Sequence, residues 1–296
     1  MNSATNVFFL YKIAKKEHLI SLAEGHVYFS CCGNWANIGK IGCGKGQGDK
    51  YECVFAKYLR KNSRKPIQHY RKLFGKDLIV EHEGEYVLLK RKSSLYIPAA
   101  CFYSLDNASV VQYLPSEDKE RIDKILKDNP SQNKITVTDF PINLSDDYFK
   151  EFNLDSQDID AAMIQPREFL NKLSEKGILY NKVTYIDMSN EYDIWKEQLY
   201  QKYGYNLSEA QDLHLEMFFK DKSNYEHQCE LRLICYDKSF TSIKQSLIVD
   251  LSGLSFIRCG EDKSTTNATG IDIFCYVKNQ YHMATVVVER QNDNDK

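Results

Sequence analysis

Apolar and polar residues alternate along several short segments of the chain, as they do in half-buried β-strands. The clearest case lies near residue 230, where Glu230 and Arg232 alternate with two leucines, so that the charges share one face of the strand. Residues 77–90 alternate in the same way around Gly84, which predicts a hairpin. Other strands are predicted over residues 8–13, 26–30, 95–105, 178–188, 246–251, 271–277 and 283–289.

Helical patterns lie between these strands without a regular alternation. Pro66 suits the first turn of a helix that ends near Phe74, and Ser116 suits the N-cap of a helix that ends near Asp128. Irregular mixing favours an α+β fold over a doubly wound sheet. We interpret residues 1–296 as a single domain with a helical insertion at about 114–177. Further helices are predicted over 15–25, 52–62, 155–176 and 191–203, and from Ser208 onward.

The composition is that of an ordinary soluble protein. Of the 296 residues, 43% are hydrophobic and 27% are charged. No apolar run approaches the roughly 20 residues that span a bilayer, so we expect no membrane association. Nine cysteines without regular spacing, and no recognisable signal segment, favour a reducing cytoplasm without disulfides.

One stretch of the chain is strongly basic. Between Lys57 and Lys76 there are eight Lys or Arg residues and no Asp or Glu, interleaved with aromatic side chains. Such a segment suits the phosphates and bases of a nucleic acid. It also suits the solvated face of an amphipathic helix, and both interpretations stay open here. The candidate nucleic-acid-binding residues are Arg60, Lys61, Arg64, Lys65, Arg71 and Lys72.

Residues 33–48 hold six of the fourteen glycines. The sequence from Gly39 to Gly46 nearly matches a phosphate-binding loop, but Gly46 replaces the hydroxyl residue that holds Mg²⁺ in such loops. We therefore expect a glycine-rich loop beside a ligand and no such phosphate site. The cysteines of this region form no C-x-x-C pair, so we expect no metal site; they are Cys31, Cys32, Cys43 and Cys53.

The carboxylate of Glu230 is costly to place in a strand that is otherwise apolar, unless another group pairs with it or uses it. The simpler explanation is an ion pair with Arg232 at the surface, which would contribute little to stability. The other explanation is that Glu230 belongs to a functional site. The residues around Glu230 alone leave both open.

Several short motifs together resemble those of a widespread bacterial family of uncharacterised proteins, and their order is similar to that of the ADP-ribosyltransferase fold. That fold carries a basic residue on its first strand, a Ser or aromatic element on its second, and a Glu on a late strand. The residues that carry the resemblance are Leu10-Tyr11-Lys12, Leu22, Gly25, Val27-Tyr28-Phe29-Ser30, Gly48-Asp49-Lys50-Tyr51-Glu52, Phe218-Phe219-Lys220, Tyr225-Glu226, Glu230 and Arg232.

The resemblance implies a split β-sheet core and NAD as a substrate. The seven scattered histidines have no metal-binding spacing, so no metal is expected. The resemblance assigns Glu230 as the catalytic residue, because a carboxylate near the ribose stabilises the cation-like centre that forms as nicotinamide leaves. It assigns NAD contacts to five further residues, which are Lys12, Tyr28, Ser30, Tyr51 and Arg232. Two departures put individual contacts in doubt: the better-known transferases carry Arg or His where Lys12 falls, and Gly48-Asp49 alters the second motif. Taken singly, Tyr28 would more often be a packing residue and Lys12 a solvated charge at a strand edge.

The function expected from the resemblance and the basic stretch is ADP-ribosylation of RNA or DNA by an intracellular toxin or anti-phage effector. A toxin would need an antitoxin or chaperone as its partner. Three alternatives stay open: transfer to a protein, hydrolysis of NAD, and a non-catalytic module that binds nucleic acid or another partner.

Overall fold

The computed structural model describes residues 7–41, 48–106, 116–129, 134–142, 159–164, 166–199, 214–237, 239–251, 273–276 and 282–289. Its contacts divide the chain into two compact units. The first unit is built from the described residues between 26 and 101 and between 171 and 251. The second is built from those before 26, those between 102 and 170, and those after 272. The interpretation of the chain as one domain stays a prediction, because two such units can belong to one domain.

The second unit contains an antiparallel sheet organised around its first strand. That strand pairs along one edge with the end of β6 and along the other with β8, so that Leu10 lies between Ser104 and Ile164. Strand β8 then pairs with β15, and β7 pairs with β16 in a separate ladder. The elements are β1 (Val7–Lys15), α1 (Lys16–Ala23), β6 (Pro98–Asp106, whose first residues belong to the first unit), α6 (Ser116–Asp128), β7 (Lys134–Ile142), β8 (Ile159–Ile164), β15 (Ile273–Tyr276) and β16 (His282–Glu289).

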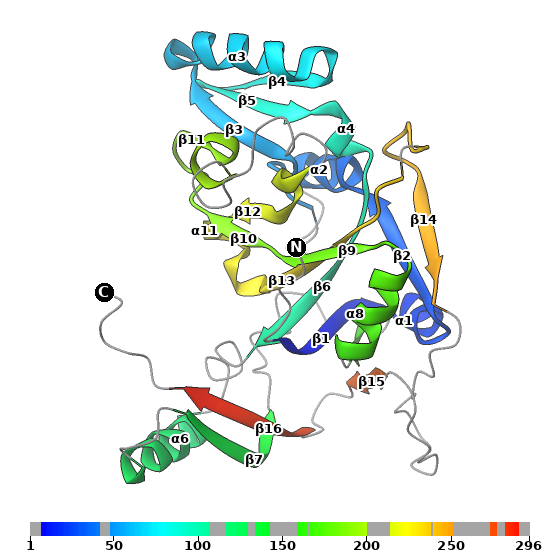
Figure 1. Cartoon of the computed structure of the whole chain (residues 1–296), viewed down its shortest axis with the longest axis vertical. Helices are drawn as coiled ribbons and strands as arrows, with labels where there is room; N and C mark the ends of the chain where they lie inside the picture. Colours follow the sequence, from blue (N-terminus) through cyan, green and yellow to red (C-terminus); the bar gives the residue numbers. More distant parts are fainter. Residues whose placement is uncertain are drawn as a thin grey trace. The chain divides into compact units, whose positions relative to one another are not determined.

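The first unit contains a four-stranded antiparallel sheet in the order β11-β3-β5-β4 (Figure 1). Helix α3 lies against this sheet and inserts Tyr70 and Phe74 beside Phe55 and Trp195, with neighbouring ring centroids 4.9 to 6.4 Å apart. Buried aromatic contacts of this kind fix the helix on the sheet. The elements are β3 (Val54–Leu59), η1 (Arg60–Asn62), α3 (Arg64–Phe74), η2 (Gly75–Asp77), β4 (Leu78–Glu83), β5 (Tyr86–Arg91), α4 (Lys92–Leu95), β11 (Tyr192–Asp193) and the π-helix η3 (Ile194–Leu199).

The rest of the first unit places further strands beside the start of β6. Strand β2 pairs with it on one side, with Ser30 opposite Ala99, and β14 extends the ladder beyond β2. Strand β13 also pairs with β6, and β9 pairs with β13 (Figure 1). The elements are β2 (His26–Cys31), α2 (Cys32–Ile41), α8 (Pro166–Glu175, shared with the second unit), β9 (Leu179–Lys182), β10 (Thr184–Ile186), η4 (Leu215–Phe218), β12 (Phe219–Asp221), α11 (Lys222–Tyr225), η5 (Glu226–Gln228), β13 (Glu230–Ile234) and β14 (Ser246–Asp250).

A mixed α+β class is confirmed, and so are most of the predicted strands, the 77–90 hairpin and the helices that begin near Pro66 and Ser116. Four local predictions are wrong. Residues 54–59 and residues 159–164 form strands and not the predicted helices. The part of the glycine-rich segment before residue 42 lies in the helix α2 and not in the predicted loop. Tyr192 and Asp193 form the short strand β11 before the π-helix. The predicted helix from Ser208 to residue 213 lies outside the described residues.

The segment 114–177, predicted as a helical insertion, contains helices α6 and α8 but also strands β7 and β8. The helical insertion at about 114–177 stays a prediction. The split sheet of an ADP-ribosyltransferase stays a prediction. Among the described helices, none is long and apolar enough to cross a membrane.

Candidate functional site

Two consecutive strand pairings bring the charged residues of the first unit together. Strand β9 pairs antiparallel with β13, and β10, which follows after Val183, pairs in parallel with β12. The Val183 N–H donates to the Glu230 carbonyl oxygen at 2.8 Å, at the point where the chain passes from one pairing to the other. Glu230 at the start of β13 and Lys220 on β12 are thereby held side by side.

The charges form a four-membered network, in which Arg232 and Lys220 each contact the Glu230 carboxylate. Arg232 Nε donates to Glu230 Oε1 at 2.7 Å, and Lys220 Nζ lies 2.8 Å from Glu230 Oε2. The other end of the Arg232 guanidinium holds the Glu52 carboxylate through Nη1 and, at 3.4 Å, through Nη2. Arg232 Nη1 also donates to the Met217 carbonyl oxygen. The arginine therefore joins two carboxylates from segments about 180 residues apart, in a planar fork geometry that lysine does not have.

All four side chains are buried: Arg232 is 0% exposed, and Glu52, Glu230 and Lys220 are 1%, 2% and 8% exposed. The interpretation of Glu230 and Arg232 as a surface pair is therefore wrong. Burial by itself would raise the pKa of Glu230, but the charges of Arg232 and Lys220 outweigh burial and hold that pKa well below its ordinary value. Glu230 is accordingly ionised at neutral pH although its side chain is almost fully buried.

Polar and aromatic groups enclose the Lys220 side of the network. Lys220 Nζ donates to Gln228 Oε1 at 3.0 Å and lies 4.5 Å from the centroid of the Tyr225 ring. The Tyr225 hydroxyl donates to the Gly48 carbonyl oxygen at 2.9 Å, which ties this region to the segment that carries Asp49. The Tyr51 N–H donates to Asp49 Oδ1 at 2.8 Å, while the buried Oδ2 forms no hydrogen bond with any described residue. Burial raises the pKa of the Asp49 carboxyl.

Of the residues predicted to contact NAD, the structure joins only Arg232 directly to Glu230. Tyr28 is 56% exposed on β2, and Ser30, two residues on, is buried and accepts a hydrogen bond from Asn34 Nδ2 at 3.3 Å. Neither forms a hydrogen bond with Glu230 in the structure. Tyr51 is half-buried between two ammonium groups, with Lys50 Nζ and Lys57 Nζ 4.6 and 5.3 Å from its ring centroid.

Lys12 belongs to the second unit, where its Nζ lies 5.0 Å from the centroid of the Phe102 ring. This cation–π contact gives the side chain a local partner within its own unit. The assignment of Lys12 to an NAD phosphate or ribose stays a prediction.

Two members of the network, Glu52 and Lys220, had no role in the sequence-based site. Both lie inside motifs that carry the resemblance, so their positions in those motifs were a signal that could have singled them out. No rule of spacing relates Glu52 to Arg232, because their contact depends on the tertiary structure that brings β13 beside the residues before β3. The Cys101 thiol, which forms a hydrogen bond with Glu230, gave no sequence signal at all.

Three potential metal ligands also lie close to the network. The ligand atoms of Cys32, Glu52 and Cys53 are within 4.8 Å of one another, and all three residues are buried. Burial raises the pKa of the Cys32 thiol far above its ordinary value. The Glu52 carboxylate is bound by Arg232. The expectation that the chain binds no metal stays a prediction.

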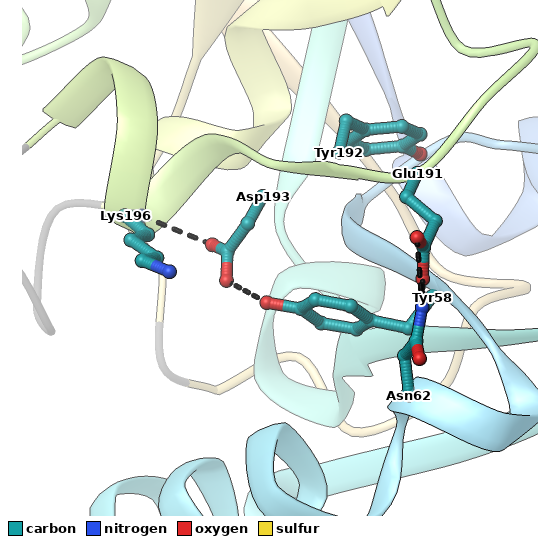
Figure 2. Close-up of a pocket in the computed structure, with 6 residues that line it drawn as sticks. All are labelled: Tyr58, Asn62, Glu191, Tyr192, Asp193 and Lys196. Atoms are coloured by element: carbon teal, nitrogen blue, oxygen red, sulfur yellow. Dashed lines mark hydrogen bonds between the residues drawn. The ribbon is translucent and has the colours of Figure 1, made fainter.

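A second arrangement in the first unit is an open cavity of about 300 Å³ beside the start of α3, lined by Tyr58, Asn62, Glu191, Tyr192, Asp193 and Lys196 (Figure 2). The six predicted nucleic-acid-binding residues lie on η1 and α3 next to it, and all six are exposed. The structure thus leaves these six cations exposed, whereas Lys57, the first residue of the basic stretch, is buried.

Comparison of the chain with protein-family models, with curated proteins and with solved structures finds no match in any of the three. The ADP-ribosyltransferase resemblance accordingly rests on the motifs given above, and the function is inferred from those motifs and from the geometry of the site.

Proposed function

We propose that the chain is an NAD-dependent ADP-ribosyltransferase in which Glu230 is the catalytic carboxylate and a nucleic acid is the acceptor. One observation carries the proposal: Glu230 is an ionised carboxylate, held in a buried place by two cations. Oriented charges in such surroundings stabilise charge that develops in a transition state more strongly than water does. The motif resemblance supplies the identity of the substrate.

The proposed reaction breaks the bond between the ribose C1′ and the nicotinamide nitrogen, and nicotinamide leaves with the bonding electron pair. The acceptor atom forms a new bond to C1′ and loses a proton. Glu230 would face the sugar as its positive charge develops and would accept a hydrogen bond from a ribose hydroxyl. A carboxylate offers about four acceptor positions, and three in Glu230 are taken by Arg232, Lys220 and the Cys101 thiol. Tyr28, Ser30 and Tyr51 are the proposed contacts of the nicotinamide and its ribose within the same unit.

The test uses two matched variants, Glu230→Gln and Glu52→Gln. Each removes one negative charge from the same buried network and from the same arginine, but only Glu230 is proposed to meet the sugar. The purified protein is incubated with labelled NAD and with RNA, DNA or lysate, and the label is followed. Thermal unfolding of both variants is measured beside wild type, so that lost folding is separated from lost chemistry.

Transfer of label to nucleic acid, a large loss in Glu230→Gln and near-wild-type transfer in a comparably stable Glu52→Gln would support the proposal. Equal losses in the two variants would show that the network acts through the fold alone. Label found only in protein would move the acceptor to protein, and free ADP-ribose without transfer would identify an NAD hydrolase.

A second candidate function is a non-catalytic module that binds nucleic acid or another partner. Two features favour it: Glu230 is only 2% exposed, and each of its carboxylate oxygens contacts a cation. Ion networks with a purely structural role have the same two features. Failure of the wild-type protein to consume NAD under any of the acceptor conditions would select this candidate. If the transferase activity is found and harms the host cell, an antitoxin or chaperone partner is expected, as proposed for a toxin or anti-phage effector.

A further inference from the structure

Helix α3 has one apolar face and one cationic face. Its apolar residues recur at the three- and four-residue spacing of a buried stripe, and Tyr70 is buried against Phe55. The cations occupy the opposite side and, together with those of η1, are exposed. Within the described part of the chain, none of these cations forms an ion pair with a carboxylate. They are Arg60, Lys61, Arg64, Lys65, Arg71 and Lys72.

The same helix is fastened to the wall of the cavity by a buried carboxylate. Asp193 accepts hydrogen bonds from the Tyr70 hydroxyl at 2.8 Å (Oδ1) and 2.7 Å (Oδ2). It also accepts one from the Tyr58 hydroxyl of β3 and one from the Lys196 N–H at 3.0 Å (Figure 2). Asp193 therefore joins β11, β3 and α3 at one point. The basic surface and the cavity are held in a fixed relation, with Asn62 of η1 belonging to the cavity wall.

The cavity wall is rich in hydrogen-bond acceptors. Glu191 is exposed at its rim, where Oε1 accepts from the Leu59 N–H at 2.7 Å and both oxygens accept from Asn62 Nδ2 at 3.1 Å. Oε1 therefore accepts two hydrogen bonds, and Oε2 keeps one acceptor position for a ligand. The rings of Tyr58 and Tyr192 contribute flat aromatic surface (Figure 2). A volume of about 300 Å³ lies at the low end of ligand pockets and suits a single base.

We propose that this cavity binds one base of a single-stranded nucleic acid, with guanine preferred, while the cations of η1 and α3 hold the phosphates on either side. Single strands are bound by cations that follow the backbone and by aromatic side chains on which bases stack. Guanine has two adjacent N–H donors on its pairing edge, and they would replace Asn62 Nδ2 on the two oxygens of Glu191, as an arginine fork binds a carboxylate. Glu191 would face the base, and the cations outside the cavity would face the backbone. The inference rests on the proposed function only in its choice of nucleic acid as the ligand.

The test measures binding in the absence of NAD, so that it does not depend on the transferase chemistry. Fluorescence anisotropy is recorded with thymidine oligonucleotides of about ten nucleotides, within the range of a single-stranded site. Each carries one central guanine, inosine or 7-deazaguanine. Inosine lacks the 2-amino donor, whereas 7-deazaguanine keeps both donors and changes only the other edge. The variant Glu191→Gln is compared with Glu175→Gln, which changes an exposed carboxylate on α8.

We expect guanine and 7-deazaguanine to bind alike and inosine to bind about 5- to 100-fold more weakly, the range of one bidentate base contact. Glu191→Gln should abolish that preference, and Glu175→Gln should preserve it. Replacing Arg60, Lys61, Arg64 and Lys65 together by Ala should weaken binding to all three oligonucleotides and reduce the slope of log affinity against log salt by about 3.

Equal affinity of the wild-type protein for guanine and inosine would overturn the base assignment. An unchanged salt slope in the fourfold variant would overturn the assignment of the phosphates. Absence of oligonucleotide binding at low salt would overturn both. Specific binding by a protein that transfers no ADP-ribose would leave this inference standing while the proposed activity failed.

Discussion

Replacing Arg232 tests the buried network most directly. In Arg232→Met the two carboxylates of Glu52 and Glu230 lose the guanidinium that joins them, and Lys220 remains as the only cation that contacts Glu230 in the described structure. The substitution also leaves the Met217 carbonyl oxygen without this donor and removes a guanidinium 5.4 Å from the Trp35 ring centroid. Removing one partner of a buried ion pair typically costs about 3–5 kcal/mol of unfolding free energy. We expect a loss in this range, because both carboxylates are almost fully buried.

The loss is measured by urea unfolding, followed by the fluorescence of the two tryptophans. Arg232→Lys keeps a positive charge without the fork and should lose less, which provides a second variant if Arg232→Met does not fold. The double variant Arg232→Met with Glu52→Gln should recover part of the loss, since it removes one of the carboxylates left without a partner.

The pH dependence supplies an independent check. In wild type the pKa of Glu230 is lowered, so the stability that its ionised form contributes is present above its ordinary pKa of about 4.5 and is lost as pH falls below that value. Removing Arg232 abolishes most of this contribution, and the difference between variant and wild type should therefore be larger at pH 7 than at pH 4. A loss below about 1 kcal/mol at both pH values, as for an exposed pair, would refute the account of the network.

Two further predictions concern the first unit. Burial by itself would raise the pKa of Glu216, but Arg91, His214 and Ser94 lower it to about 2. Its ionised form thus contributes on the order of 3 kcal/mol to the free energy of unfolding above pH 4.5, and this contribution is lost toward pH 2. In urea unfolding, Glu216→Gln should therefore be markedly destabilising at pH 6 and nearly neutral near pH 2. An effect that does not change with pH would contradict this account. Gly48 has a φ of +81°, and a Cβ there would lie 2.6 Å from the Trp35 carbonyl oxygen, whereas at Gly84 (φ +55°) nothing lies within 4 Å. Gly48→Ala should therefore lower the melting temperature more than Gly84→Ala, which carries only a backbone strain of about 1–2 kcal/mol. Equal shifts in melting temperature would show that the chain moves to relieve the contact between the new Cβ and the Trp35 carbonyl oxygen.

The alternation around Glu230 was enough to predict strand β13, because period-two patterns reflect local backbone geometry. The stripe of α3 and the turn of the 77–90 hairpin were predictable for the same reason. Local patterns gave the wrong secondary structure where tertiary packing decides between helix, strand and loop. Residues 54–59 lie between β5 and β11 within a sheet and therefore form a strand in spite of their helical appearance. The glycines before residue 42 are likewise accommodated in α2.

The sequence by itself determined which residues carry charge in an apolar setting, and so it identified Glu230, Arg232 and the basic stretch. Only the tertiary structure decided their partners: Glu52 reaches Arg232 across about 180 residues, and Asp193 joins β11, β3 and α3. It also decided that all five residues of β13 are buried, although alternation predicted one polar face. The reason is physical, since the pKa of a carboxyl depends on burial and on the charges a few ångströms away. Those neighbours are set by strand pairing and not by spacing along the chain.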